Sequence, residues 1–146
     1  MTHLRHIVIM ALLIILVSGT VVAQDEGFPD PAFFAGGYRL VGKAIDSDST
    51  FTGTVLLRIA GDSLIVERTV KGECIEGSWG LEYALGREMR VVRMRFPYGE
   101  DTLEATYQWH ADFDNYPRLS GYLYRKGAAT DDPGMEVLFF QLLDPD

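Results

Sequence analysis

The sequence predicts an all-β protein: an antiparallel eight-stranded up-and-down barrel, preceded by an N-terminal signal peptide helix. Between residues 37 and 143, eight segments alternate apolar and polar residues or are rich in β-branched and aromatic ones, and turn-forming residues separate them. No window of about 11 residues in this region repeats its apolar positions with the helical period of about 3.6. A two-sheet β-sandwich is the alternative. Local turns between neighbouring segments favour the barrel, which eight strands suffice to close.

The N-terminal residues have the order of regions that a secretory signal peptide shows. Arg5 precedes an uninterrupted apolar run over residues 7–17, and Val21 and Ala23 place small residues before a cleavage site at Gln24. The run is too short for a membrane span, which needs about 20 residues, although an uncleaved anchor stays the alternative. The sequence therefore predicts a secreted or periplasmic protein with a signal peptide (1–23), an N-terminal extension (24–36) and a barrel domain (37–143).

The charge balance restricts the partners. The chain of 146 residues has 13 Lys and Arg against 21 Asp and Glu, a formal net charge of −8. Cleavage removes Arg5, which leaves 12 basic against 21 acidic residues and a net charge of −9. A nucleic-acid partner needs a positive face, so we expect none. The single cysteine excludes an internal disulfide scaffold.

Four strands are predicted in the first half of the mature chain. Val55 and Leu57 alternate with Thr54 and Arg58, which is the period of a half-buried strand. The Gly-Asp pair at 61–62 suits a tight hairpin turn. The four segments cover residues 37–44, 51–60, 63–70 and 73–83.

Four more strands are predicted in the second half. Leu103, Tyr107 and Trp109 share one face of the clearest alternating segment, and Glu104 lies on the other. The last segment is apolar on both faces, so we expect it to cover the N-terminal segment, a partner subunit or another protein. The four segments cover residues 88–96, 102–111, 119–125 and 135–143.

Glycine and proline predict irregular positions in this pattern. Gly77 and Gly80 interrupt the fourth segment and indicate a bulge or a bend. Pro97, Tyr98 and Gly99 indicate the turn between the fifth and sixth segments.

Charged residues in the middle of predicted strands argue against a barrel that spans an outer membrane. Such a barrel carries a continuous apolar band around strands of about 9–11 residues. The charged residues that interrupt a band of this kind are Arg58, Arg68, Glu76, Arg93 and Glu104. We therefore expect no membrane insertion after the signal peptide is cleaved.

Two short stretches indicate a family. Gly37-Tyr38-Arg39 lies where lipocalins begin their first strand with Gly-x-Trp, although here Tyr follows the Gly directly and no Trp comes after it. Phe51-Thr52-Gly53-Thr54 on the second segment is similar to a stretch in avidins. With the strand pattern over residues 37–143, the chain resembles the calycin-type barrels, the group that contains lipocalins and avidins. The resemblance implies a closed barrel that binds a small molecule.

The sequence offers few residues for catalysis. His110 is the single histidine of the mature chain, which excludes a metal site with two or three histidine ligands. Ser63, Ser78 and Ser120 lack the Gly-x-Ser-x-Gly surroundings of a nucleophile elbow. We therefore predict that the protein is not an enzyme and has no cofactor, and that His110 lies on the polar face at a strand end.

A loop after the sixth segment is rich in oxygen ligands. Asp112, Asp114 and Asn115 lie close together, but the glycine and the final glutamate of an EF-hand loop are missing. We expect a solvated turn, with a looser calcium site as the alternative. The alternative to a non-enzymatic protein is an enzyme in which His110, beside Asp112 and Asp114, acts as a general acid or base.

Cys74 is the lone thiol of a chain predicted to reach an oxidising compartment. We expect it to be buried as a small apolar residue. The alternative is an intermolecular disulfide between two chains, so the oligomeric state stays open.

Aromatic residues are the candidate ligand-binding site. Tyr107 and Trp109 share one face of the sixth segment, Tyr122 and Tyr124 share one face of the seventh, and Trp79 lies on the fourth. Such side chains either line a ligand pocket or pack as core. The sequence predicts an exported, non-enzymatic binding module for an apolar or aromatic small molecule. The alternative is a protein–protein module, such as an inhibitor of a secreted hydrolase or an envelope assembly factor.

Overall fold

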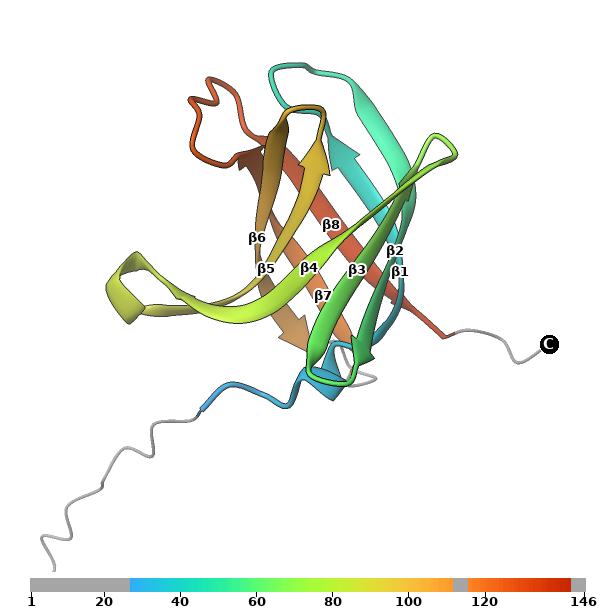
Figure 1. The fold of residues 1–146 in the computed structure, drawn as a ribbon, viewed down its shortest axis with the longest axis vertical. Coiled ribbons are helices and arrows are strands. Elements are labelled where there is room, and N and C mark those ends of the chain that lie inside the picture. The colour runs from blue at the N-terminus through green and yellow to red at the C-terminus, as the bar shows by residue number, and fades with distance from the viewer. Residues whose placement is uncertain (1–26, 112–115, 143–146) are drawn as a thin grey trace, which may run out of the picture.

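Eight antiparallel strands close into a barrel in the computed structural model of the protein, which describes residues 27–111 and 116–142 (Figure 1). Each strand pairs with the next, and the last pairs with the first. The structure confirms the predicted all-β up-and-down barrel, and the closure excludes the two-sheet sandwich. The predicted signal peptide lies outside the described residues. The strands are β1 (Gly36–Lys43), β2 (Thr50–Ala60), β3 (Ser63–Val70), β4 (Glu73–Ala84), β5 (Met89–Tyr98), β6 (Asp101–Ala111), β7 (Pro117–Arg125) and β8 (Gly134–Gln141).

The strand ends lie close to the predicted ones, but the turn expected at Pro97 is misplaced. Pro97 lies inside β5 and pairs with Thr102 of β6. Proline has no backbone N–H to donate, so within sheets it occurs where one side of the strand lacks a neighbour. That condition is met because the ladder between β4 and β5 ends at Ser78↔Arg95. The chain turns at Gly99, whose φ of 60° suits glycine.

Strand β4 changes its partner along its length. Residues 73–78 pair with β3, and residues 78–84 pair with β5. Gly77 lies at this change, and a Cβ atom there would come within 2.1 Å of the carbonyl oxygen of Arg95. Gly80 has open space around it. The close approach of β5 therefore requires glycine at the first of the two predicted positions. Beyond this point β4 and β5 extend as a ribbon that ends at η2 (Leu85–Arg87) (Figure 1).

Alternating side chains fill the barrel interior. On β5, Val92, Met94 and Phe96 are buried, whereas Arg93 and Arg95 form ion pairs with Glu82 on the outer face. Burying large apolar side chains contributes about 1.5–3 kcal/mol each. The alternation read from the sequence therefore places the core on the inward faces of the strands.

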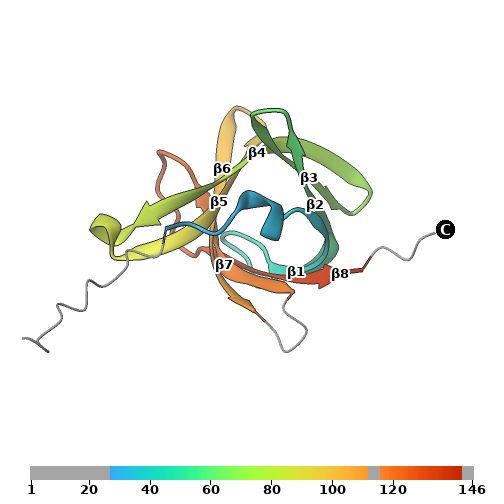
Figure 2. The same ribbon diagram turned by 90° about the horizontal axis from the view of Figure 1, so that it is seen from below.

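The N-terminal segment seals one end of the barrel. η1 (Pro31–Phe33) crosses this end, as the view from below shows (Figure 2). Phe34 follows and is fully buried, and its ring packs edge-on against Trp79 and Trp109 at centroid distances of 6.3 and 5.4 Å. The Tyr38 hydroxyl donates a hydrogen bond to the Phe34 carbonyl oxygen at 2.7 Å and ties this plug to β1. Neither η1 nor η2, the helices of the described ranges, has the length and apolarity of a membrane span.

Strand β8 packs on both of its faces. Inside the barrel, Leu138 is fully buried and Phe140 meets Tyr38 edge-on with centroids 5.3 Å apart. On the outside, the Arg39 guanidinium lies over the Phe139 ring, 5.5 Å from its centroid. The inner apolar face of β8 therefore forms core, and an arginine of β1 covers part of the outer face.

Candidate functional site at the open end of the barrel

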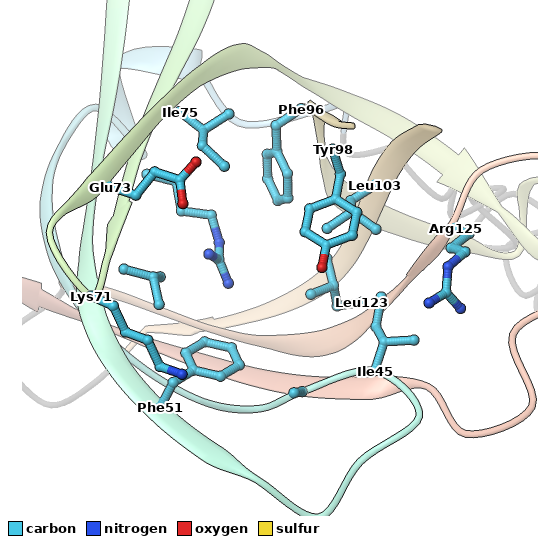
Figure 3. Close-up of a pocket in the computed structure, with 13 residues that line it drawn as sticks. Ile45, Phe51, Lys71, Glu73, Ile75, Phe96, Tyr98, Leu103, Leu123 and Arg125 are labelled. Atoms are coloured by element: carbon cyan, nitrogen blue, oxygen red, sulfur yellow. The ribbon is translucent and has the colours of Figure 1, made fainter. Parts of the chain in front are cut away.

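The barrel end opposite η1 contains a pocket of about 300 Å³ (Figure 3). Its walls are mainly apolar and come from strands on different sides of the barrel. Ile45 follows β1, Phe51 lies on β2, Ile75 on β4, Phe96 on β5 and Leu123 on β7, and their side chains surround the opening (Figure 3). We call this cavity the mouth pocket.

At the mouth pocket, β4 and β5 are not paired with each other. Residues 73–77 of β4 pair with β3, and residues 96–98 of β5 pair with β6. The ladder between β4 and β5 starts only at Ser78↔Arg95, deeper in the barrel. Side chains of Ile75 and Phe96 therefore line an opening between two strands that elsewhere are neighbours (Figure 3).

A buried ion pair lies at the inner side of the mouth pocket. Arg68 of β3 is only 8% exposed and Glu136 of β8 only 1%. The Arg68 Nη2 donates to Glu136 Oε1, and the Tyr107 hydroxyl donates to Glu136 Oε2. Burial, together with the neighbouring Glu136 carboxylate, holds the pKa of the Tyr107 phenol well above its usual range. Tyr107 therefore stays a neutral donor.

The Arg68 guanidinium also has an aromatic environment. It lies 5.2 Å from the centroid of the Phe51 ring and 5.4 Å from that of Phe96, and both rings line the mouth pocket. The Arg68 Nε is buried and has no hydrogen-bond partner in the described structure. Because buried N–H groups are nearly always paired, this atom is a donor without its usual compensation.

The rim of the pocket carries both signs of charge. Arg125 Nη1 donates to Asp46 Oδ2 at 2.5 Å, and this hydrogen bond lowers the pKa of the Asp46 carboxyl. Lys71 and Glu73 are exposed at the rim and oppose each other in sign (Figure 3). Arg68 is matched by Glu136 and Arg125 by Asp46, so the charged residues that line the mouth pocket balance when these direct partners are included.

The five aromatic residues predicted to bind ligand do not form one site. Trp79 and Trp109 pack on Phe34 at the sealed end, and Tyr107 reaches Glu136 from inside the barrel. The other two, Tyr122 and Tyr124, lie on the outer side of β7, where Tyr122 is 56% exposed. None of the five is among the residues that line the mouth pocket in the described structure.

Tyr122 and Tyr124 line a second hollow on the outside of the barrel, which we call the outer groove. It has a volume of about 800 Å³ and lies between the β4–β5 ribbon and the outer faces of β6 to β8. The Tyr124 hydroxyl is 2.7 Å from Thr106 Oγ1 and donates to Glu104 Oε1 at 2.9 Å. Burial raises the pKa of this phenol. Met135 of β8 forms part of the wall and is 51% exposed.

The prediction that Cys74 is buried is wrong. Cys74 is exposed, since Glu73 and Ile75 on either side of it line the mouth pocket and alternation turns the residue between them outward. His110 is exposed at the end of β6, as its place on the polar face predicts. The loop residues Asp112, Asp114 and Asn115 lie outside the described residues. Within the described ranges, no group of three His, Cys, Asp or Glu side chains is placed to hold a metal ion.

Arg68 and Glu136 were missed as candidates, although the sequence carries a signal for each. Arg68 is two positions from both Val66 and Val70. Glu136 is two positions from Leu138 and four from Phe140. In a strand, residues two apart share a face, so each charge lies on an inward face, and Arg68 does not interrupt an outward-facing band as expected from the sequence. Two opposite charges at inward positions of different strands indicate a buried pair.

In comparisons with known proteins, no protein family matches the chain, and none of the curated proteins matches its sequence. What the structure shows is a closed eight-stranded antiparallel barrel, an architecture consistent with that of the calycins.

Proposed function

We propose that the protein is an exported, non-enzymatic binding module that takes a small, mainly apolar or aromatic molecule into the mouth pocket. The observation that carries this proposal is the contrast between the two ends of the barrel. Phe34 and η1 seal one end, whereas the other end opens into a cavity of about 300 Å³. A calycin-like role in carrying a ligand agrees with this arrangement, and the predicted signal peptide supports a place outside the cytoplasm.

The size and chemistry of the pocket support a ligand of one or two rings. A cavity of about 150 Å³ lined by apolar side chains holds benzene, and the mouth pocket has about twice that volume. Apolar walls with a few polar groups are the usual composition of small-molecule sites. Phe51, Phe96 and Leu123 supply such walls, and Arg68 supplies a polar group. Most of these residues lie on paired strands, so the pocket is formed before a ligand arrives.

Fluorescence of a neutral aromatic dye tests the proposal. N-phenyl-1-naphthylamine becomes bright in apolar surroundings, and we expect its emission to rise and saturate when the protein is added. Ile75→Trp places an indole ring in the mouth pocket, where it blocks the dye, and should abolish the rise. Ile59→Trp is the matched control, because Ile59 is 44% exposed and lies at the other end of β2. An absent signal, or an equal loss in both variants, would refute binding in the mouth pocket.

A protein–protein module is the second candidate, and the outer groove favours it. Exposed apolar side chains such as Tyr122 and Met135 beside a groove of about 800 Å³ are typical of surfaces that bind another protein. The acidic net charge suits a basic partner. This hypothesis predicts a stoichiometric partner whose binding is lost in Tyr122→Ser/Met135→Ser and retained in Ile75→Trp. Retention of the partner by the double variant would argue against it.

A further inference from the structure

We propose that the ligand of the mouth pocket is uncharged and presents a carbonyl-type oxygen to the Arg68 guanidinium, which selects ketones, esters or amides over carboxylates. This inference rests on the proposed function and specifies its ligand class. It follows from three features of the pocket: a donor without a partner, a charge that is already neutralised, and lining residues at the rim that provide no unmatched cation.

The donor is the Arg68 side chain. Nη2 is engaged by Glu136, whereas Nε is buried with no partner. Arg68 also belongs to the wall of the mouth pocket. An arginine has five N–H donors and no acceptor, so an oxygen acceptor is the group that complements it. An oxygen that reaches the guanidinium would compensate a donor that the protein leaves unsatisfied.

The charge state of the pair decides which oxygen is accepted. Arg68 and Glu136 together carry no net charge, and both are almost fully buried. A ligand carboxylate would bring a second negative charge close to Glu136, in surroundings where charges are poorly screened. It would also lose its hydration without gaining an unpaired cation. A neutral carbonyl makes the hydrogen bond without either penalty.

The rim does not alter this preference. Arg125 is held by Asp46 at 2.5 Å, and exposed Lys71 is offset by exposed Glu73. The Arg68 guanidinium carbon lies 5.2 Å from the centroid of the Phe51 ring and 5.4 Å from that of the Phe96 ring. An aromatic ligand in the pocket can pack against these two rings. The ligand class that fits all of these contacts is an aryl or alkyl ketone, ester or amide of one or two rings.

Three probes of nearly equal shape test the preference at neutral pH: 2-acetylnaphthalene, 2-naphthoate and 2-ethylnaphthalene. Dissociation constants are measured by two-dimensional NMR titration. In the wild-type protein we expect 2-acetylnaphthalene to bind about tenfold more tightly than either of the others, the value of one hydrogen bond in an apolar site. Arg39→Met, on the outer face of β1, is the control for an arginine variant and should keep this order.

Two variants separate the donor from the charge balance. Glu136→Gln leaves the Arg68 charge unpaired, so 2-naphthoate should overtake 2-acetylnaphthalene. Arg68→Met/Glu136→Gln removes the donor and both charges, while the oxygen of the introduced amide can still accept from Tyr107. In that variant, 2-acetylnaphthalene and 2-ethylnaphthalene should bind equally well. If Glu136→Gln alone does not fold, the double variant decides.

The outcomes distinguish this inference from the function on which it rests. If 2-ethylnaphthalene binds in the pocket and 2-naphthoate binds as tightly as 2-acetylnaphthalene in the wild-type protein, the ligand class is wrong and the binding function stands. If 2-acetylnaphthalene still binds more tightly than 2-ethylnaphthalene in Arg68→Met/Glu136→Gln, Arg68 is not the donor and the inference is overturned. If none of the three probes binds, the proposed function itself fails.

Discussion

Arg68 and Glu136, which are 68 positions apart in the sequence, form an ion pair inside the barrel beside the one end that stays open. Arg68 comes from β3 and Glu136 from β8, and Tyr107 of β6 adds a hydrogen bond to the same carboxylate. Three strands that are not neighbours in the barrel thus meet in one polar cluster. The pair joins these strands at the inner side of the mouth pocket and leaves the buried Arg68 Nε without a hydrogen-bond partner.

Removing one partner of this ion pair should lower the free energy of unfolding more than removing both. Arg68→Met leaves the Glu136 charge buried without its cation, and we expect a loss of about 3–5 kcal/mol in the free energy of unfolding. Arg68→Met/Glu136→Gln removes both charges and should recover most of that loss. Urea unfolding at a fixed temperature measures both. A double variant less stable than Arg68→Met would contradict the account of the pair.

Gly121 should not tolerate a side chain. A Cβ atom at this position would lie 1.9 Å from the Thr106 carbonyl oxygen, so β6 and β7 would have to separate. We expect Gly121→Ala to lower the free energy of unfolding by about 1–3 kcal/mol, as overpacking does. Gly80→Ala is the matched control, because nothing lies within 4 Å of a Cβ atom there. Thermal unfolding that fails to separate the two variants would show that the close approach is not a constraint.

The plug at the sealed end should contribute strongly to stability. Phe34 is fully buried against Trp79 and Trp109, and Phe34→Ala should cost about 3–5 kcal/mol. Phe33 is only partly buried on the same segment, so Phe33→Ala should cost clearly less. Equal, small effects in urea unfolding would mean that the segment before β1 does not seal the barrel in solution.

The outer ion pairs predict a dependence of stability on acid. Glu82 accepts from Arg95 at 2.6 Å and from Arg93 at 2.9 Å, and these contacts, the Arg95 hydrogen bond first, hold its pKa below 4.5. A carboxyl whose pKa is lower in the folded state stabilises the fold above its unfolded pKa and loses this effect as the pH falls through its folded pKa. The wild-type protein should therefore be more stable than Glu82→Gln at neutral pH.

That difference should shrink below pH 4.5, the ordinary pKa of this glutamate side chain, and vanish in stronger acid. Urea unfolding of both proteins across the acid range measures it. Glu100→Gln, in the exposed turn between β5 and β6, controls for the change in net charge. A difference that stays constant with pH would refute the role of the Glu82 charge.

The strands were predictable because alternation and turn residues act locally. Val92, Met94 and Phe96 alternate with polar residues along one strand, so they share the buried face whichever strands pair with it. Gly61, with a positive φ, forms a turn between two strands that follow each other in the sequence. The mouth pocket was not predictable in this way. It depends on where β4 leaves β5, and Gly77, whose backbone approaches that of Arg95 closely, lies at this point.

The candidate site was only partly predictable for a related reason. Tyr107 was found as an inward aromatic residue, but its role as a donor to Glu136 depends on a strand distant in the sequence. The placement of Tyr122 and Tyr124 on the outer face follows from parity, as does that of Arg68 on the inner one. The five aromatic residues predicted to bind ligand do not line the mouth pocket, whereas the inward position of Arg68 indicates it.

Contacts between 2-acetylnaphthalene and the methyl groups of the protein test the central claim most directly. Intermolecular nuclear Overhauser effects should connect the naphthalene protons to Ile75 and Leu123 in the mouth pocket, and none should reach Leu119 or Leu57 deeper in the core. Such a pattern would place the ligand at the open end, beside Arg68. Contacts confined to Met89 and Met135 of the outer groove, or an absence of contacts at saturating ligand, would contradict the account.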